Sequence, residues 1–241
     1  MELTKTTDIA SSTSPMSALI TMFYDPRRAF GMLEPKRHAW LPLVLLIISA
    51  VVLMTWYFSV VDFSWLMDQM FATVKDASQR AAAKSMMTRN MMRITTLITS
   101  VLLYPAMFAV TGLYFMIVGK SINKDVGFGT GFALSAWASV PGLLMLPLGA
   151  VAITLASGGQ LGFSELNPLS LNQLFFHHEL THPMTSVLDS ISVTSIWGMV
   201  LTVIGFQVWA KVSTSTALKV VLIPYLIIFG GWFAFALSKA A

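Results

Sequence analysis

Five long apolar stretches constrain what this chain can fold into more than any other feature of its sequence. A helix needs about 20 mostly apolar residues to cross the hydrocarbon core of a bilayer. Stretches of about that length run over residues 40–61, 94–118, 128–156, 190–210 and 220–238. The pattern predicts an all-α integral membrane protein with about five transmembrane helices, together with amphipathic interfacial helices in its connections.

The small number of charged residues supports the same class of protein. Only 11% of the 241 residues are charged and 56% are hydrophobic, whereas a soluble domain carries roughly 25% charged residues because its surface must be solvated. The chain has no cysteine, which excludes disulfides, thiolate metal sites, thiol nucleophiles and S-palmitoylation. Its net charge of +4 is too small, and its basic residues are too scattered, to indicate a nucleic-acid partner.

The Lys and Arg residues of the connections indicate the direction of insertion, because cytoplasmic connections carry an excess of them. With a cytoplasmic N-terminus, nine of the 15 lie on the cytoplasmic side and six on the other, and the connection 157–183 contains none. We therefore expect a multi-pass protein of the cell (cytoplasmic) membrane with its N-terminus in the cytoplasm. Residues 1–39 are predicted to form a cytoplasmic amphipathic leader, and residues 40–238 the five-span membrane domain.

Two short amphipathic helices are predicted within the leader. Ser14-Pro15 and Asp25-Pro26 are each typical of a helix start, with a capping side chain before a proline. The apolar residues of the second helix, Phe30 and Leu33, are expected to face the membrane. Four basic residues flank the entry to the first span: Arg27, Arg28, Lys36 and Arg37. Each is attracted to an anionic lipid surface by about 1 kcal/mol, and a docking patch for a cytoplasmic partner is the alternative interpretation.

Four prolines fall inside or near the middle of the apolar stretches: Pro105, Pro141, Pro147 and Pro224. Each frees a backbone carbonyl that needs another partner at membrane depth. They indicate either a kinked bundle with an intramembrane polar site or simple helix packing, and Pro141 with Pro147 is expected to split the third span. Asp189 is the acidic residue inside or near the fourth span, as either an intramembrane polar group or an N-cap at the outer interface.

The segment His178-Glu179-Leu180-Thr181-His182 matches the H-E-x-x-H pattern of zinc peptidases, in which two histidines one helical turn apart bind the metal. Pro183 follows at once and interrupts the helix that must hold both histidines. A third ligand at the usual spacing is missing, and the motif lies in a connection between spans. We therefore expect no catalytic residue, no metal site and no cofactor, with His178 and His182 as surface histidines.

Motifs spread along the chain resemble those of the Yip family, multispanning membrane proteins named for interaction with Ypt/Rab GTPases. The first two are Asp25-Pro26-Arg27-Arg28-Ala29-Phe30 and the segment from Gly127-Phe-Gly-Thr-Gly-Phe to Ser139-Val-Pro141-Gly. The others are Asn167-Pro168-Leu-Ser-Leu, Ser195-Ile-Trp197-Gly, Ile204-Gly205-Phe, and Ala217-Leu-Lys219 through Ile223-Pro224. The resemblance covers nearly the whole chain beyond residue 20.

The resemblance implies five spans, a cytosolic N-terminus and no known enzymatic activity. Eukaryotic members of the family take part in vesicle traffic and bind prenylated Rab proteins. With its short leader, this chain is more similar to the prokaryotic branch, in which Rab partners do not exist. The resemblance therefore does not imply GTPase binding here.

These features predict a non-enzymatic polytopic membrane protein that organises the membrane, interacts with lipid or binds a partner. The expected partners are the lipid bilayer and a second copy of the chain or another membrane protein, and not nucleic acid. One alternative is a small-solute or lipid transporter that uses the kinked spans and Asp189. Another is a zinc metallopeptidase at His178, Glu179 and His182.

Reporter fusions at the two ends of the chain test the predicted topology. An N-terminal fusion should report the cytoplasm and a C-terminal fusion the opposite compartment, because an odd number of spans separates them. One reporter that is active only in the cytoplasm and one that is active only outside it make the measurement. Signals from the same compartment at both ends would contradict five spans.

Overall fold

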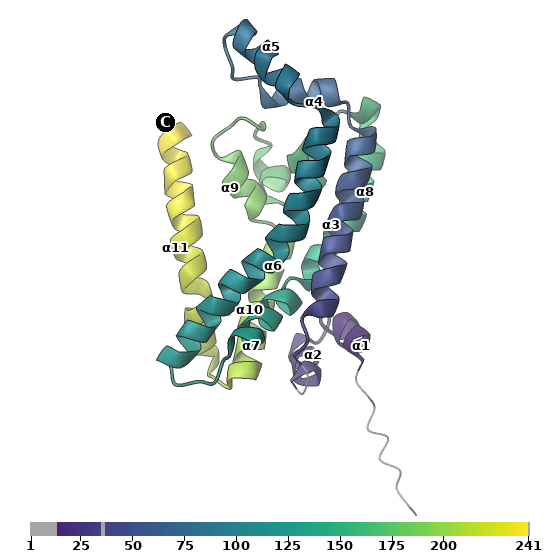
Figure 1. The fold of residues 1–241 in the computed structure, drawn as a ribbon. Coiled ribbons are helices and arrows are strands. Elements are labelled where there is room, and N and C mark those ends of the chain that lie inside the picture. Colours follow the sequence, from purple (N-terminus) through teal and green to yellow (C-terminus); the bar gives the residue numbers. More distant parts are fainter. Residues whose placement is uncertain (1–13, 35–36, 241) are drawn as a thin grey trace, which may run out of the picture.

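Figure 1 shows a bundle of long helices in the computed structural model, which describes residues 14–34 and 37–240. Within these residues, five helices are long and apolar enough to cross a membrane. They are α3 (Trp40–Val60), α6 (Arg89–Ser121), a third span covering Phe128–Leu155, α10 (Val193–Ala210) and α11 (Thr214–Ala240). The prediction of an all-α membrane protein with five spans is confirmed.

The third span is interrupted in its middle. α7 (Phe128–Ala138) is followed by a 3-10 turn, η1 (Val140–Leu144), and α8 (Met145–Leu155) completes the crossing. Pro141 lies in the 3-10 turn, since it has no N–H to donate and cannot continue the preceding helix. Pro147 lies in the first turn of α8, where backbone N–H groups have no partner within the helix anyway. The predicted split is therefore confirmed, with the break at Pro141.

The other two prolines, Pro105 and Pro224, lie inside continuous helices, α6 and α11. Figure 1 shows α6 changing direction about half-way along its length, and Pro105 lies in the middle of its 33 residues. A proline removes one backbone hydrogen bond and is a common cause of such a bend.

Three of the five spans begin at other residues than predicted. α6 begins five residues earlier than predicted, where the Thr88 hydroxyl accepts a hydrogen bond from Met91 N. α10 begins three residues later, because Ser192 is its N-cap and pairs with Ser170 in an isolated β-bridge. α11 begins six residues earlier, where the Ser213 hydroxyl accepts a hydrogen bond from Thr216 N (3.2 Å). In each case a polar group at the helix end, rather than the limit of the apolar stretch, sets the boundary.

The short helices lie toward the two ends of the bundle (Figure 1). α1 (Pro15–Thr21) and α2 (Pro26–Leu33) lie at the end where α6 and α10 finish and α7 and α11 begin. α4 (Phe63–Met70), α5 (Ala77–Met86) and α9 (Thr185–Ser190) lie toward the opposite end, as does the end of α11. The two N-terminal helices and the C-terminus are therefore on opposite sides of the five spans.

α5 projects from the bundle at that opposite end, and none of its residues is buried. Asp76 is its N-cap. The Ser78 hydroxyl and the backbone N–H groups of Gln79 and Ser78 donate hydrogen bonds to the Asp76 carboxylate. These bonds lower the pKa of Asp76, and the bond from the Ser78 hydroxyl has the largest effect. A carboxylate that stays ionised at the start of a helix also interacts favourably with the helix dipole.

Glycines let α6 and α7 approach each other closely. A Cβ added at Gly131 of α7 would lie 2.8 Å from Gly112 O and 3.0 Å from Phe115 Cβ, both in α6. The hydroxyls of Thr111 and Ser135 form a hydrogen bond of 2.6 Å across the same contact. Small residues and hydroxyl pairs are typical of helix contacts inside membranes, where packing and hydrogen bonding replace hydrophobic association.

Gly131→Ala should therefore lower the free energy of unfolding by roughly 1–3 kcal/mol, the usual cost of an extra carbon in a well-packed contact. Gly129 lies in the same helix, and no atom lies within 4 Å of a Cβ added there. Gly129→Ala is thus the matched control, expected to be neutral or stabilising by up to about 1 kcal/mol. Unfolding in mixed micelles with increasing dodecyl sulfate measures both. Equal stabilities would contradict the close approach of α6 and α7.

Candidate functional site

α2 holds basic residues at one end of the bundle while its own apolar face is buried. The helix begins where the Asp25 carboxylate accepts a hydrogen bond from Arg28 N (3.1 Å) and Pro26 takes the first helical position. The start of α1 at Pro15 follows the same pattern, so both predicted helix starts are confirmed. The buried residues of α2 are Ala29, Phe30 and Leu33.

Phe30 is completely buried in the protein, against α10. Its ring packs edge-on against Trp209, with 5.3 Å between ring centroids, and Trp209 Nε1 donates a hydrogen bond to Phe30 O (2.9 Å). Gly205 leaves room for this contact, since a Cβ there would lie 2.6 Å from the Phe30 ring. The expectation that Phe30 and Leu33 face the membrane is therefore wrong, because the fourth span provides the apolar surface that they cover.

Two arginines near α2 contact groups that are distant in the sequence. Arg27 Nη2 donates a hydrogen bond to Gln207 Oε1 (2.7 Å), and Arg37 Nη1 donates one to Thr130 Oγ1 (3.1 Å). The Arg37 guanidinium also lies 5.4 Å from the centre of the Trp209 ring, within range of a cation–π interaction. The Arg27 contact holds α2 itself against α10, and the Arg37 contacts hold that residue, which comes after α2, against α7 and α10.

The other two residues predicted to contact lipid are Arg28 and Lys36. Arg28 is exposed on α2, as is Arg27 in spite of its hydrogen bond. Lys36 lies outside the described residues. Contact between these basic residues and lipid stays a prediction, now for side chains on a helix that is anchored in the protein.

The end of the bundle that contains α2 is basic, whereas the opposite end is neutral. Among the described residues, the α2 end carries seven Lys and Arg residues and three acidic residues, a net charge of +4. These are Arg27, Arg28, Arg37, Lys120, Lys124, Lys211 and Lys219, with Asp25, Glu34 and Asp125. The opposite end carries six of each and has no net charge. These are Lys75, Arg80, Lys84, Arg89, Arg93 and Lys239, with Asp62, Asp68, Asp76, Glu165, Glu179 and Asp189.

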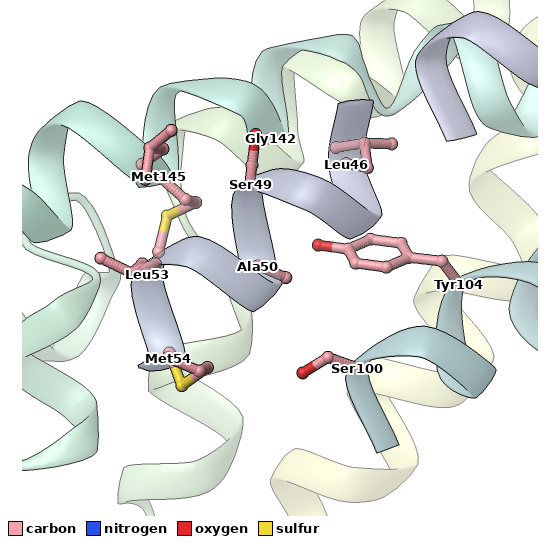
Figure 2. A pocket seen from close by; sticks show the side chains of 10 residues that line it. Leu46, Ser49, Ala50, Leu53, Met54, Ser100, Tyr104, Gly142 and Met145 are labelled. Carbon is pink, nitrogen blue, oxygen red and sulfur yellow. The ribbon is translucent and has the colours of Figure 1, made fainter. Parts of the chain in front are cut away.

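A cavity of about 170 Å³ lies among the spans, between α3, α6, η1 and the start of α8 (Figure 2). Most of its lining is apolar: Leu46, Ala50, Leu53, Met54, Gly142, Met145 and Leu146. The hydroxyl side chains of Ser49, Ser100 and Tyr104 interrupt this lining. Figure 2 shows the Ser100 and Tyr104 hydroxyls pointing from α6 toward α3. Tyr104 is the sixteenth of the 33 residues of α6, so the cavity lies about half-way along that helix.

Three of the four prolines lie beside this cavity. Pro105 follows Tyr104 directly, and Pro141 and Pro147 are each adjacent to a lining residue of η1 or α8. Pro224 lies in α11, which contributes no lining residue. The break in the third span and the proline of α6 therefore coincide with the cavity.

Asp189 lies in α9, outside the five spans. The N-cap of α10 is Ser192, whose hydroxyl accepts a hydrogen bond from Ser195 N (3.1 Å). The Asp189 carboxylate accepts a hydrogen bond from the Ser164 hydroxyl instead. The N-cap interpretation is therefore wrong, because α9 ends at Ser190 and two extended residues separate it from α10.

His178 and His182 stack on each other, with 3.8 Å between ring centroids, in a segment without helical structure. The buried Asn172 side chain holds this segment, since it accepts a hydrogen bond from His178 N (2.9 Å) and donates one to His178 O (3.2 Å). His182 Nδ1 accepts a hydrogen bond from Met184 N (3.2 Å). In residues 14–34 and 37–240, no three His, Asp or Glu residues are grouped so that they could hold a metal ion.

The family model described as the Yip1 domain matches residues 20–236, from within α1 to within α11. The chain belongs to the Yip1-domain family. No curated protein and no solved structure matches it. The resemblance in the sequence motifs is confirmed, and the match includes α2, the cavity and all five spans of this Yip1-domain protein.

Sequence reasoning missed the residues that anchor α2 and those that line the cavity. Trp209, Thr130 and Tyr104 lie in apolar stretches, where an aromatic or hydroxyl side chain is most often a packing residue. Gln207 carried a detectable signal, because an amide near the end of a span needs a hydrogen-bond partner. Its partner, Arg27, lies 180 residues away in sequence and is not evident from the local pattern.

Trp209→Phe should loosen α2 without disrupting the bundle. Phenylalanine keeps a ring beside Phe30 but leaves the buried Phe30 carbonyl without its donor, at a cost of about 1–3 kcal/mol. Amide hydrogen exchange over residues 26–34 should become roughly tenfold faster or more. The matched control is Trp197→Phe in the same helix, since Trp197 contacts Phe23 of the N-terminal segment ring to ring. Equal exchange in both variants would contradict the anchoring role of the Trp209 indole.

Proposed function

We propose that this Yip1-domain protein is a non-enzymatic membrane-organising protein that holds anionic lipid against the basic α2 end of its bundle. The observation that carries the proposal is the charge asymmetry, with a net +4 at the α2 end and none at the other. The ends of the spans lie at the level of the lipid headgroups, where each basic residue is attracted to an anionic surface by about 1 kcal/mol. The family is not known for an enzymatic activity, which agrees with a role without chemistry.

The anchoring of α2 supports this proposal. Because Phe30 and Leu33 are buried in the protein, the position of α2 does not depend on the lipid around it. Arg27 and Arg28 are thus presented by a fixed helix. Two further basic residues lie near the end of that helix: Lys211 Nζ is 3.4 Å from Glu34 Oε1, and Lys124 Nζ donates a hydrogen bond to Lys211 O (3.1 Å). A fixed cluster of charges loses less conformational freedom on binding an anionic headgroup than a mobile one does.

The same asymmetry supports a cytoplasmic location for the α2 end in a cell membrane. Retention of Lys and Arg on the cytoplasmic side orients multispanning proteins, and the inner surface of that membrane carries anionic lipid. A protein that gathers anionic lipid at that surface changes the local lipid composition and so organises the membrane around it.

Lipid retention tests the proposal directly. Wild-type protein and the variant Arg28→Gln/Lys120→Gln/Lys219→Gln are reconstituted in equal parts of phosphatidylglycerol and phosphatidylcholine and then extracted in mild detergent. The three side chains are exposed, so their replacement should leave the fold intact. Native mass spectrometry measures the ratio of the two lipids that stay bound. The wild type should prefer phosphatidylglycerol, and the variant should lose up to about fivefold of this preference per residue.

The control removes the same charge from the opposite end, through Lys75→Gln/Arg93→Gln/Lys239→Gln. It should retain the lipid preference of the wild type. Equal retention of both lipids by the wild type, or an equal loss in both triple variants, would contradict a lipid site at the α2 end. The basic residues would then serve topology or the docking of a protein partner.

A further inference from the structure

We propose that the cavity between α3, α6 and α8 binds a membrane-soluble molecule that has a hydroxyl-bearing ring, such as a phenol. The cavity lies about half-way along α6 and therefore at neither of the two ends of the bundle that carry the charged residues described above. Its ten lining residues include none of the basic residues of the α2 end. The proposal therefore goes beyond the proposed lipid function and stands or falls independently of it.

The size of the cavity limits the ligand to a group of about one ring. Its volume is about 170 Å³, and an apolar protein cavity of roughly 150 Å³ is known to hold one benzene molecule. The lining is mainly leucine and methionine, which suits an apolar ring because methionine is flexible and makes favourable contacts with aromatic edges. A phospholipid headgroup is excluded, since it is strongly polar and lies at the surface of the bilayer rather than at this depth.

The hydroxyl groups of the lining determine the polar part of the ligand. The Ser100 hydroxyl donates a hydrogen bond to Thr96 O (2.8 Å), so its oxygen is left as an acceptor. The Tyr104 hydroxyl, in contrast, forms no hydrogen bond with another residue in the described part of the chain. The Tyr104 hydroxyl, which points from α6 toward α3 in Figure 2, is therefore available as a donor toward the cavity. At membrane depth, where water is scarce, a hydroxyl without a partner is unfavourable.

A ligand hydroxyl can pair with both the donor and the acceptor of the lining, because a hydroxyl accepts one hydrogen bond and donates another. It can accept from the Tyr104 hydroxyl and donate to the Ser100 oxygen, two groups that Figure 2 shows on the same side of the cavity. A saturated acyl chain fills the apolar part of the cavity but leaves the Tyr104 hydroxyl without a partner and the Ser100 oxygen without a donor. An ether or ketone accepts from Tyr104 but cannot donate to Ser100. The chemistry of the lining thus favours an alcohol or phenol over an acyl chain.

Photolabelling of the protein in lipid nanodiscs tests this assignment. The probe is a phenol that carries a diazirine in the para position, and mass spectrometry locates the labelled peptides. Label should be concentrated on residues 46–54 and 142–146, and excess 4-ethylphenol should remove most of it. 4-Ethylanisole has the same ring but no hydroxyl hydrogen, and it should compete about fivefold less well, the value of one hydrogen bond.

Two variants and one control complete the experiment. Tyr104→Phe keeps the ring and should lower labelling about fivefold, whereas Ala50→Leu should fill the cavity, keep the fold and abolish the label. Tyr225→Phe removes a hydroxyl from α11, which does not line the cavity, and should label as the wild type does. Label spread evenly over the lipid-facing helices, equal competition by the phenol and the anisole, or unchanged label in Tyr104→Phe and Ala50→Leu would each overturn the proposal.

Discussion

The buried hydrogen bond from Trp209 Nε1 to Phe30 O determines how the N-terminal segment is attached to the spans. Phe30 lies in the last turn of α2, where backbone carbonyls have no partner within the helix. A buried carbonyl of this kind needs a donor from elsewhere, and the indole of the fourth span supplies it. The absence of a side chain at Gly205 lets the Phe30 ring fit beside that indole. An amphipathic helix that could lie on lipid is thereby made part of the protein core.

The break at Pro141 has a comparable effect inside the bundle, because it lets the two halves of the third span pack against different helices. α7 packs closely against α6 at Gly131, while α8 packs against α3, where a Cβ added at Gly149 would lie 2.7 Å from Leu53. A straight helix could not follow both partners. The cavity of Figure 2 lies beside this break, where Gly142 of η1 and Met145 and Leu146 of α8 line it.

The sequence was sufficient to predict the fold class, the five spans, the starts of α1 and α2 and the split of the third span. These features depend on apolar length, on capping residues and on proline, all of which act locally. The burial of Phe30 and the lining of the cavity were not predictable, since they depend on contacts between distant residues. The capping of α10 by Ser192 is local, but it was missed because Asp189 was interpreted as the cap. Phe30 illustrates the limit: an apolar helix face is compatible with lipid or with another helix, and the chain supplies the helix only much later, at Trp209.

That separation has a consequence for biosynthesis. Phe30 and Trp209 are 179 residues apart, and a ribosome that adds about 5–20 residues per second needs roughly 10–35 seconds to reach the second after the first. During that interval the first three spans can enter the membrane, but α2 has no fourth span to cover its apolar face. Its basic residues and its exposed phenylalanine are then available to the membrane surface or to a chaperone. The N-terminal segment is among the first parts of the chain to be made and among the last to reach its final position.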